Sequence, residues 1–325
     1  MKRGFHLIAG ASLAAVALTS AWTVKAQTAP EPPVQIHTLT PFTVQEQVFR
    51  KLSEHVWEIP DMSRPGNPNV LIIVGTRATL VVDSGMGPKS GEVVARRVQS
   101  VSTNKTLYLV TSDFRPEHIT GGMSLPADTV WIVPEGQKAD IHNITQSYID
   151  SFSARSADLA NTLKGVKLRE PDITFDRDAA VDLGGGVTVK LMWFGPAFTN
   201  GDVAVFIEPD KVLYSGNFLG SKTYPTVPKN VANLENWMSV MDKLDVLHPV
   251  IVVPNHGDVR DGTLIASQRD ALRDLQQRAH ELRAQGVSAD EAGATLTAEF
   301  DPRHADWKGL GAIPAIVRSF YAETQ

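Results

Sequence analysis

The feature that most constrains the fold is a series of short apolar runs, separated by turn-forming residues. In the first half of the chain, two such runs at 69–74 and 79–83 are joined by the four residues Gly75-Thr76-Arg77-Ala78. Two more follow at 106–110 and 130–133. Runs of this length indicate buried strands, and the short connection indicates a hairpin. The first half therefore predicts a sheet whose centre is covered on both faces.

The second half of the chain has the same organisation. Its apolar runs lie at 187–193, 202–207, 211–215 and 250–253. Segments with helical spacing lie beside the strands of both halves, at 90–101, 136–164 and 233–243. Two such halves predict two facing sheets with helices outside, a four-layer αββα sandwich of the α/β class. We place this domain at residues 46–262.

Only helical patterns follow the last strand, at 264–285, 289–300 and 313–322. We therefore expect residues 263–325 to form a C-terminal helical extension. Polar residues cluster where the strands end, which is where α/β folds place their sites.

The first residues predict export. Lys2 and Arg3 precede an apolar stretch, and Val24-Lys25-Ala26 offers small residues for cleavage before Gln27. This order is typical of a secretory signal peptide, here residues 1–26. The alternative is an uncleaved anchor, since about 20 apolar residues can span a bilayer. Residues 27–45 begin with a Pro-rich segment and are interpreted as a flexible leader.

Charge and cysteine content exclude several classes of protein. Without residues 1–26 the chain has 28 basic and 36 acidic residues, a net charge of −8. An acidic chain without a basic run has no electrostatic basis for binding nucleic acid. It has no cysteine, so neither a disulfide nor a lipidated cysteine anchor is available. We expect a periplasmic or secreted protein that acts on a small molecule and has no stable membrane anchor after cleavage; the sequence does not indicate an oligomeric state.

Four motifs in order across residues 69–258 resemble those of the metallo-β-lactamase superfamily. The first is the hairpin followed by Leu80-Val-Val-Asp83-Ser-Gly-Met-Gly87, and the second is Gly195-Pro-Ala-Phe-Thr-Asn-Gly-Asp202, similar to the family's Gly-Pro-x-His-Thr-x-Gly-Asp loop. The third is Tyr214-Ser-Gly-Asn-Phe-Leu219, and the fourth is Val253-Pro-Asn-His-Gly-Asp258, similar to the family's final Pro-x-His-Gly turn. The resemblance implies the same αββα fold.

The resemblance also implies a zinc centre, but most ligands of the first zinc position are replaced. The family's HxHxDH motif corresponds here to Asp113-Phe-Arg-Pro-Glu-His118. Arg115 and Phe198 stand where the family has histidines, and Asn217 stands where it has the bridging aspartate. A guanidinium does not deprotonate in proteins, so Arg115 would repel a cation bound beside it. We expect no first zinc, which argues against β-lactamase activity itself.

The second position retains a plausible ligand set. Glu117, His118 and His256 combine one carboxylate with two imidazoles, the ligand types of catalytic zinc sites with an open position. The alternative is a salt-bridge cluster in which Arg115 replaces the missing cation and pairs with Asp113 or Glu117. Asp83 corresponds to a residue that orients the metal loop in the family, or else it caps the turn after its strand.

Two functions follow from these residues. The first is a hydrolase of esters, lactones, amides or similar substrates, in which one divalent ion, zinc by resemblance, activates water. The second is a metal-free, non-catalytic pseudoenzyme that binds a small anionic ligand through Arg115. Asp113 would be a general base in the first and the ion-pair partner of Arg115 in the second.

The signal-peptide interpretation makes a direct prediction. N-terminal sequencing of protein collected outside the cytoplasm should begin near Gln27, because cleavage follows the Val-Lys-Ala site. Recovery of exported protein with residues 1–26 intact would contradict it.

Overall fold

The computed structural model describes residues 41–64, 66–227 and 233–322. The first sheet is formed by β1 (Arg50–Lys51), β2 (Val56–Ile59), β3 (Val70–Val74), β4 (Ala78–Val82), β5 (Thr106–Val110), β6 (Val130–Pro134) and β7 (Ile173–Phe175). The second is formed by β8 (Asp178–Gly184), β9 (Val187–Met192), β10 (Ala204–Glu208), β11 (Val212–Tyr214) and β12 (Ile251–Val253). The helices are α1 (Gly87–Val101), α2 (Pro116–Ile119), α3 (Glu135–Asn143), α4 (Thr145–Ser153), α5 (Ala157–Leu163), α6 (Leu234–Asp245), α7 (Thr263–Ala284), α8 (Ala289–Phe300) and α9 (Ile313–Ala322).

Both sheets combine antiparallel hairpins with parallel pairs. In the first sheet, β1 to β4 pair antiparallel, whereas β4, β5, β6 and β7 pair parallel. In the second, β8 to β11 pair antiparallel and β12 joins β11 in parallel. The parallel pairs matter for the site, because the carboxyl ends of parallel strands open at one edge of the sheet.

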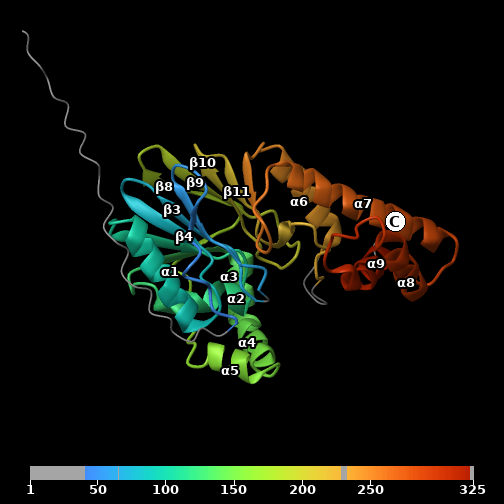
Figure 1. Ribbon diagram of the computed structural model, residues 1–325, viewed down its shortest axis with the longest axis horizontal. Helices are drawn as coiled ribbons and strands as arrows, with labels where there is room; N and C mark the ends of the chain where they lie inside the picture. The colour runs from blue at the N-terminus through green and yellow to red at the C-terminus, as the bar shows by residue number, and fades with distance from the viewer. Residues whose placement is uncertain (1–40, 65, 228–232, 323–325) are drawn as a thin grey trace, which may run out of the picture. The chain divides into compact units, whose positions relative to one another are not determined.

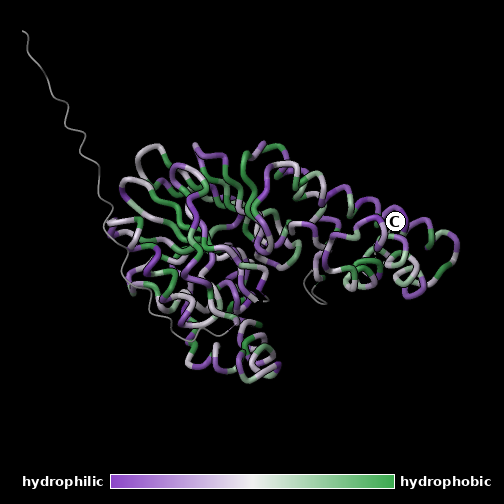
Figure 2. Tube along the Cα trace, in the orientation of Figure 1, coloured by the Kyte–Doolittle hydropathy of each residue, from purple (hydrophilic) through white to green (hydrophobic). Residues whose placement is uncertain are grey.

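Side-chain alternation divides the apolar residues into three packed layers. Leu71 and Ile73 of β3 face Val205 and Ile207 of β10 across the space between the sheets. The intervening residues point outward, so that Ile72 packs under α1 in a separate core. Strands buried on both faces are nearly continuous apolar runs, and both sheets appear in the hydrophobic colours of Figure 2.

The outer face of the second sheet shares one core with the helical extension. Phe206 of β10 lies in the same buried cluster as Trp237 of α6, Leu272 of α7 and Phe320 of α9. The sandwich and the extension are therefore joined by a continuous apolar interior. The predicted αββα architecture with a C-terminal helical region is confirmed.

The structure has strands that the sequence analysis did not identify. In β2, the apolar alternation is interrupted by Glu58, which is fully buried and forms an ion pair with Arg50 on β1. In β8, exposed and partly exposed residues alternate over most of the strand, so no apolar run marks it. Both strands lie at or next to a sheet edge, and neither has a continuous apolar run that would mark it in the sequence.

The predicted signal peptide and most of the predicted leader lie outside the described residues. The last part of the leader packs on the sandwich: Thr43 and Val44 are buried, and the Val44 amide donates to Ser90 Oγ on α1 at 3.2 Å. Among the described residues, no helix is both long and apolar enough to cross a membrane.

The shared core predicts that sandwich and extension unfold together. Leu272→Ala in α7 should lower the free energy of unfolding by about 2–5 kcal/mol, because it leaves a cavity in that core. Urea denaturation followed by tryptophan fluorescence and by circular dichroism should show one coincident transition. The control is Val246→Ala, whose side chain is 73% exposed and which should change stability by less than about 0.5 kcal/mol. Two separate transitions would show that the extension folds independently.

Candidate active site

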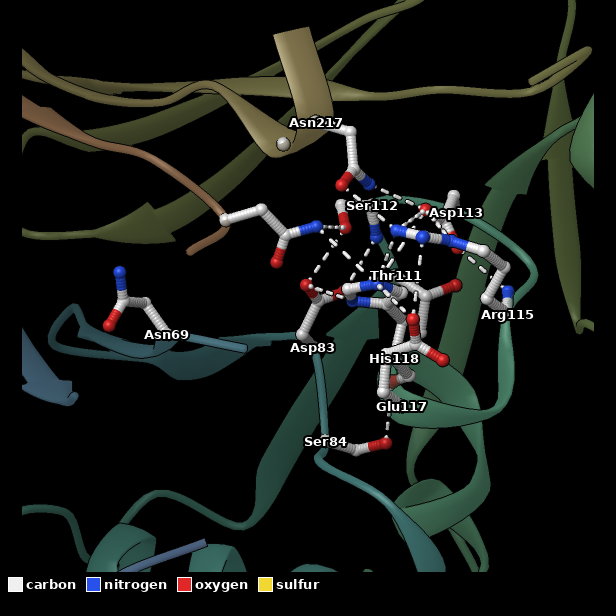
Figure 3. A network of polar contacts seen from close by, with 12 residues as sticks. Asn69, Asp83, Ser84, Thr111, Ser112, Asp113, Arg115, Glu117, His118 and Asn217 are labelled. Atoms are coloured by element: carbon white, nitrogen blue, oxygen red, sulfur yellow. Dashed lines mark hydrogen bonds and ion pairs between the residues drawn. The ribbon is translucent and has the colours of Figure 1, made fainter. Parts of the chain in front are cut away.

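The polar cluster lies where four strands end. Asp83 follows β4, residues 111–118 follow β5, Asn217 follows β11, and His256 follows β12. The two sheets thus deliver side chains to one edge of the sandwich, as Figure 3 shows for most of this network.

Asp83 is the acceptor at the centre of the cluster. Its Oδ1 accepts from the amide of Ser112 at 2.7 Å, and its Oδ2 accepts from Tyr214 Oη at 2.6 Å. The same Oδ2 contacts His118 Nδ1 at 3.0 Å and Ser112 Oγ at 2.8 Å. Asp83 is fully buried and has a left-handed backbone with φ 61°, a conformation that aspartate tolerates better than most residues. The carboxylate therefore orients both the β5 loop and the His118 ring.

Arg115 occupies the middle of the site. Pro116 begins α2, and Arg115 before it is extended, with φ −70° and ψ 154°, the conformation favoured for a residue that precedes proline. Its Nη2 lies 2.9 Å from Asp113 Oδ2, 2.9 Å from Asn217 Oδ1 and 3.1 Å from His118 Nε2.

The surroundings hold this guanidinium as a cation. Its carbon lies 4.7 Å from the centre of the Phe198 ring. Burial alone would lower the pKa of Arg115, but Asp113 and Glu117 raise it above its usual value. A permanent positive charge therefore stands among side chains that match metal-ligand positions of the family.

Asp113 is saturated with donors. It accepts from the Arg115 amide at 2.7 Å, from Arg115 Nε at 3.0 Å and from Asn217 Nδ2 at 2.6 Å. Burial would raise the pKa of Asp113, but Arg115, His118 and these hydrogen bonds lower it below the usual value. A carboxylate held in its charged form and fully hydrogen-bonded is a poor proton acceptor. The geometry favours the ion-pair role of Asp113 over the general-base role.

The two histidines have their tautomers set by neighbouring acceptors. His118 Nδ1 faces Asp83, and His256 Nδ1 lies 2.8 Å from the carbonyl of Asn67. Each Nδ1 therefore carries the proton, which leaves each Nε2 with a lone pair. Burial, with a smaller contribution from the Arg115 charge, lowers the pKa of His256 to about 4, so this ring is neutral near pH 7.

His118 is subject to opposing effects. Burial lowers its pKa, while Asp113 and Asp83 raise it, and the net direction is upward. The 3.1 Å contact between His118 Nε2 and Arg115 Nη2 nevertheless requires an unprotonated Nε2, because two N–H groups would repel at that distance. We assign the neutral form to His118.

Glu117 has an acceptor without a partner. Its Oε1 lies 3.4 Å from Arg115 Nη1, whereas Oε2 is buried and has no hydrogen-bond donor among the described residues. Glu117, His118 and His256 each present an atom able to coordinate a metal, and these atoms lie within 4.8 Å of one another. The sequence-predicted metal residues are therefore brought together.

A cavity of about 230 Å³ opens beside this cluster. Arg115, Asn217 and His256 line it together with Phe198 and Tyr224. Phe198 is at once pocket wall and core, since its ring also packs edge-on against Trp237 with centroids 5.4 Å apart. A small molecule in this cavity would meet the guanidinium and one imidazole directly.

The sequence analysis missed several contributors to the site. Tyr214, the last residue of β11, donates to Asp83, and the Asn255 amide nitrogen lies 3.3 Å from Ser112 Oγ and 3.4 Å from His118 Nε2. Thr223 and Tyr224 form part of the pocket wall. Their residue types carry no distinctive spacing, so only the packing of the two sheets and the following loop reveals them.

Comparison with known proteins identifies the fold. No protein-family model matches the sequence, and no curated protein matches it significantly. Among solved structures, a metallo-β-lactamase from Pontibacter korlensis is 17% identical with a TM-score of 0.55, the match covering 69% of this chain and 98% of that one. An archaeal metallo-β-lactamase superfamily protein from Sulfolobus tokodaii is 17% identical with a TM-score of 0.51, covering 67% and 86%.

A third structure matches more of this chain. The stereoselective inverting sec-alkylsulfatase from Pseudomonas sp. is 15% identical with a TM-score of 0.66, and the match covers 84% of this chain. The chain spans about half, 49%, of that enzyme's length. At these identities the likeness concerns the fold, and the chain has the metallo-β-lactamase fold that its motifs predicted.

Asp202, in the loop that carries Phe198, predicts a pH dependence of stability. Burial and the nearby Asp113 charge raise the pKa of Asp202 to about 7. The native state then keeps a proton that the unfolded chain releases near pH 4, so stability falls as the pH rises from about 4 to 7. This loss is at most about 4 kcal/mol, from about three pH units at 1.36 kcal/mol each.

Asp202→Asn tests this contribution, because the amide does not titrate. The free energy of unfolding, measured with urea at pH 5 and pH 8, should fall less steeply with pH in the variant than in the parent protein. Equal slopes in the two proteins would contradict it.

Proposed function

We propose that the protein is a hydrolase that uses one divalent metal ion held by Glu117, His118 and His256. The observation that carries the proposal is the convergence of these three residues, whose coordinating atoms lie within 4.8 Å of one another. In addition, Glu117 Oε2 is buried and has no donor among the described residues. One carboxylate and two imidazoles suit zinc, and they leave a position open for water.

The ligand chemistry fits such an ion. Both Nδ1 atoms are engaged by acceptors, so each imidazole offers its Nε2 lone pair, the arrangement that usually supports metal-bound histidine. The three residues would move slightly toward one another on binding the ion. His118 Nε2 would also have to exchange its contact with Arg115 for the ion.

The charge of the cluster supports one ion rather than two or none. The carboxylates of Asp83, Asp113 and Glu117 carry three formal negative charges, and Arg115 carries one positive charge. Below pH 7, where Asp202 keeps its proton, and with both histidines neutral, three against one leaves −2, which one divalent ion would neutralise and two would overcompensate. Uncompensated charge is costly in a desolvated site.

The remaining residues act on the substrate. The ion, when bound, would polarise a carbonyl or similar group and supply an activated water. Arg115, fixed by Asp113 and Asn217, presents its charge to the cavity and would hold an oxyanion or a negatively charged group of the substrate. Phe198 covers one face of the guanidinium and excludes water from it. Esters, lactones and amides are the substrate classes we propose.

One observation favours a second function, a metal-free pseudoenzyme that binds a small anion. Arg115 Nη2 already donates to the lone pair of His118 Nε2 that an ion would use. In this alternative the guanidinium takes the place of the metal permanently, and the pocket binds an anionic ligand without hydrolysing it.

We further propose that the protein acts in the periplasm or after secretion. The support is the order of a charged start, an apolar stretch and small residues within residues 1–26.

Metal titration of variants separates the two functions. In isothermal titration calorimetry with zinc after chelator treatment, the parent protein should bind about one ion. His256→Ala should bind zinc at least about tenfold more weakly, because two ligands rarely hold it. Arg115→Ala should keep or increase the affinity, since it removes a nearby positive charge and frees His118 Nε2.

The control is His142→Ala, which removes an exposed histidine of α3 outside the site. Its zinc affinity should match that of the parent. A parent protein that binds no divalent ion would overturn the hydrolase proposal in favour of the pseudoenzyme, and two tightly held ions at this site would contradict both.

A further inference from the structure

A second cavity adjoins the first. It has a volume of about 290 Å³ and shares two lining residues, Thr223 and His256, with the cavity above Arg115. A ligand that reaches His256 from one cavity therefore has the other directly beside it. We call the cavity lined by Arg115 the main pocket. The adjoining cavity, lined by Arg64 and Lys308, is called the side pocket.

The side pocket presents two cations that lack a partner. Most other arginines of the sandwich and extension are paired, as Arg50 is with Glu58 and Arg269 with Asp245. Within the described ranges, by contrast, no carboxylate forms an ion pair with Arg64 or Lys308. Arg64 and Lys308 are both exposed, and their side chains line the same concavity.

The acidic residue of the side pocket is already engaged. Asp61 Oδ2 accepts from the Gly257 amide at 2.8 Å, and its Oδ1 accepts from the Ser63 amide at 2.9 Å. These bonds hold the loop before β3 against the turn after β12. The hydroxyls of Ser63 and Ser221 line the same cavity and form no hydrogen bond within the described part of the chain. Two positive charges and two free hydroxyl donors match an oxyanion.

Lys308 is positioned by the backbone, not by its side chain. The Lys308 amide donates to the carbonyl of Lys222 at 2.9 Å, and the Tyr224 amide donates to the carbonyl of Lys308 at 2.9 Å. This short parallel bridge attaches the segment between α8 and α9 to the loop that walls the main pocket. Trp307 and His304, stacked with centroids 4.5 Å apart, pack against Tyr224 and support it. The C-terminal extension thus contributes a residue to the neighbourhood of the site.

We propose that the side pocket is a binding subsite for an oxyanion group, with Arg64 and Lys308 as its recognition residues. The substrate class that follows is a small molecule with a reacting group in the main pocket and a carboxylate, sulfate or phosphate at its other end. As a statement about the substrate this rests on the proposed function, but the subsite itself requires neither a metal nor hydrolysis.

The test uses inorganic sulfate and acetate as probes of chelator-treated protein at constant ionic strength. Amide chemical shifts in NMR titrations should move at Ser63, Ser221 and Gly257, which lie around the side pocket. Arg64→Ala and Lys308→Ala should each weaken the affinity about two- to fivefold, as expected for exposed charge pairs. The double variant should show no saturation. Comparing the affinities for sulfate and acetate shows whether the subsite prefers a tetrahedral oxyanion or a carboxylate.

The matched control is Lys105→Ala. Lys105 is exposed and immediately precedes β5, at the opposite end of that strand from the site, so its removal changes the net charge equally without touching the pocket. Its affinity for both probes should equal that of the parent. Thermal melts should show all variants folded, since the Lys308 backbone contacts remain.

Two results would overturn the subsite. One is a double variant that binds sulfate and acetate as tightly as the parent; the other is shifts that centre on Arg115 instead of the side pocket. Failure of the parent to bind zinc would overturn the proposed hydrolase and leave this measurement unaffected, so the two failures are distinguishable.

Discussion

The site depends on the buried carboxylate of Asp83. It binds the amide and hydroxyl of Ser112, the phenol of Tyr214 and the ring of His118, and so links both sheets to the loop after β5. A buried charge of this kind is tolerable only when its acceptor positions are filled. Filling them fixes the rotation of the His118 ring and, through Ser112, the start of the segment that carries Asp113 and Arg115. The rest of the arrangement is built on that fixed loop.

Replacing metal ligands with Arg115 changes the electrostatics without emptying the site. The guanidinium contacts Asp113, Asn217 and His118, which correspond in sequence to metal-ligand positions of the resembling family. An organic cation satisfies these acceptors with directional hydrogen bonds but cannot lower the pKa of water as a metal does. Any water activation must therefore take place at Glu117, His118 and His256. Under the proposed function, the protein would separate two roles, charge stabilisation and water activation, that metal ions commonly combine.

The fold was predictable because its central strands are buried on both faces and so are continuous apolar runs, as at β3, β4 and β10. Edge strands escaped prediction, since β8 has exposed residues along most of its length and no apolar run. Within the site, the motif spacing identified Glu117, His118 and His256, and the structure brings them together. Tyr214 and Lys308 carry no such signal, because their proximity to the site arises from tertiary contacts between segments distant in sequence.

The bridge between Lys308 and residues 222–224 has an evolutionary consequence. Two segments about 85 positions apart in the sequence together form one wall of the pocket. Substitutions in one segment therefore limit the substitutions that the other can tolerate. Insertions between α8 and α9 would displace the loop that holds Tyr224, and a related chain without the extension would need another edge to support that loop. Relatives should therefore gain, lose or exchange the two segments as a pair, and ligand preference in this lineage should follow the C-terminal helices as much as the strand ends.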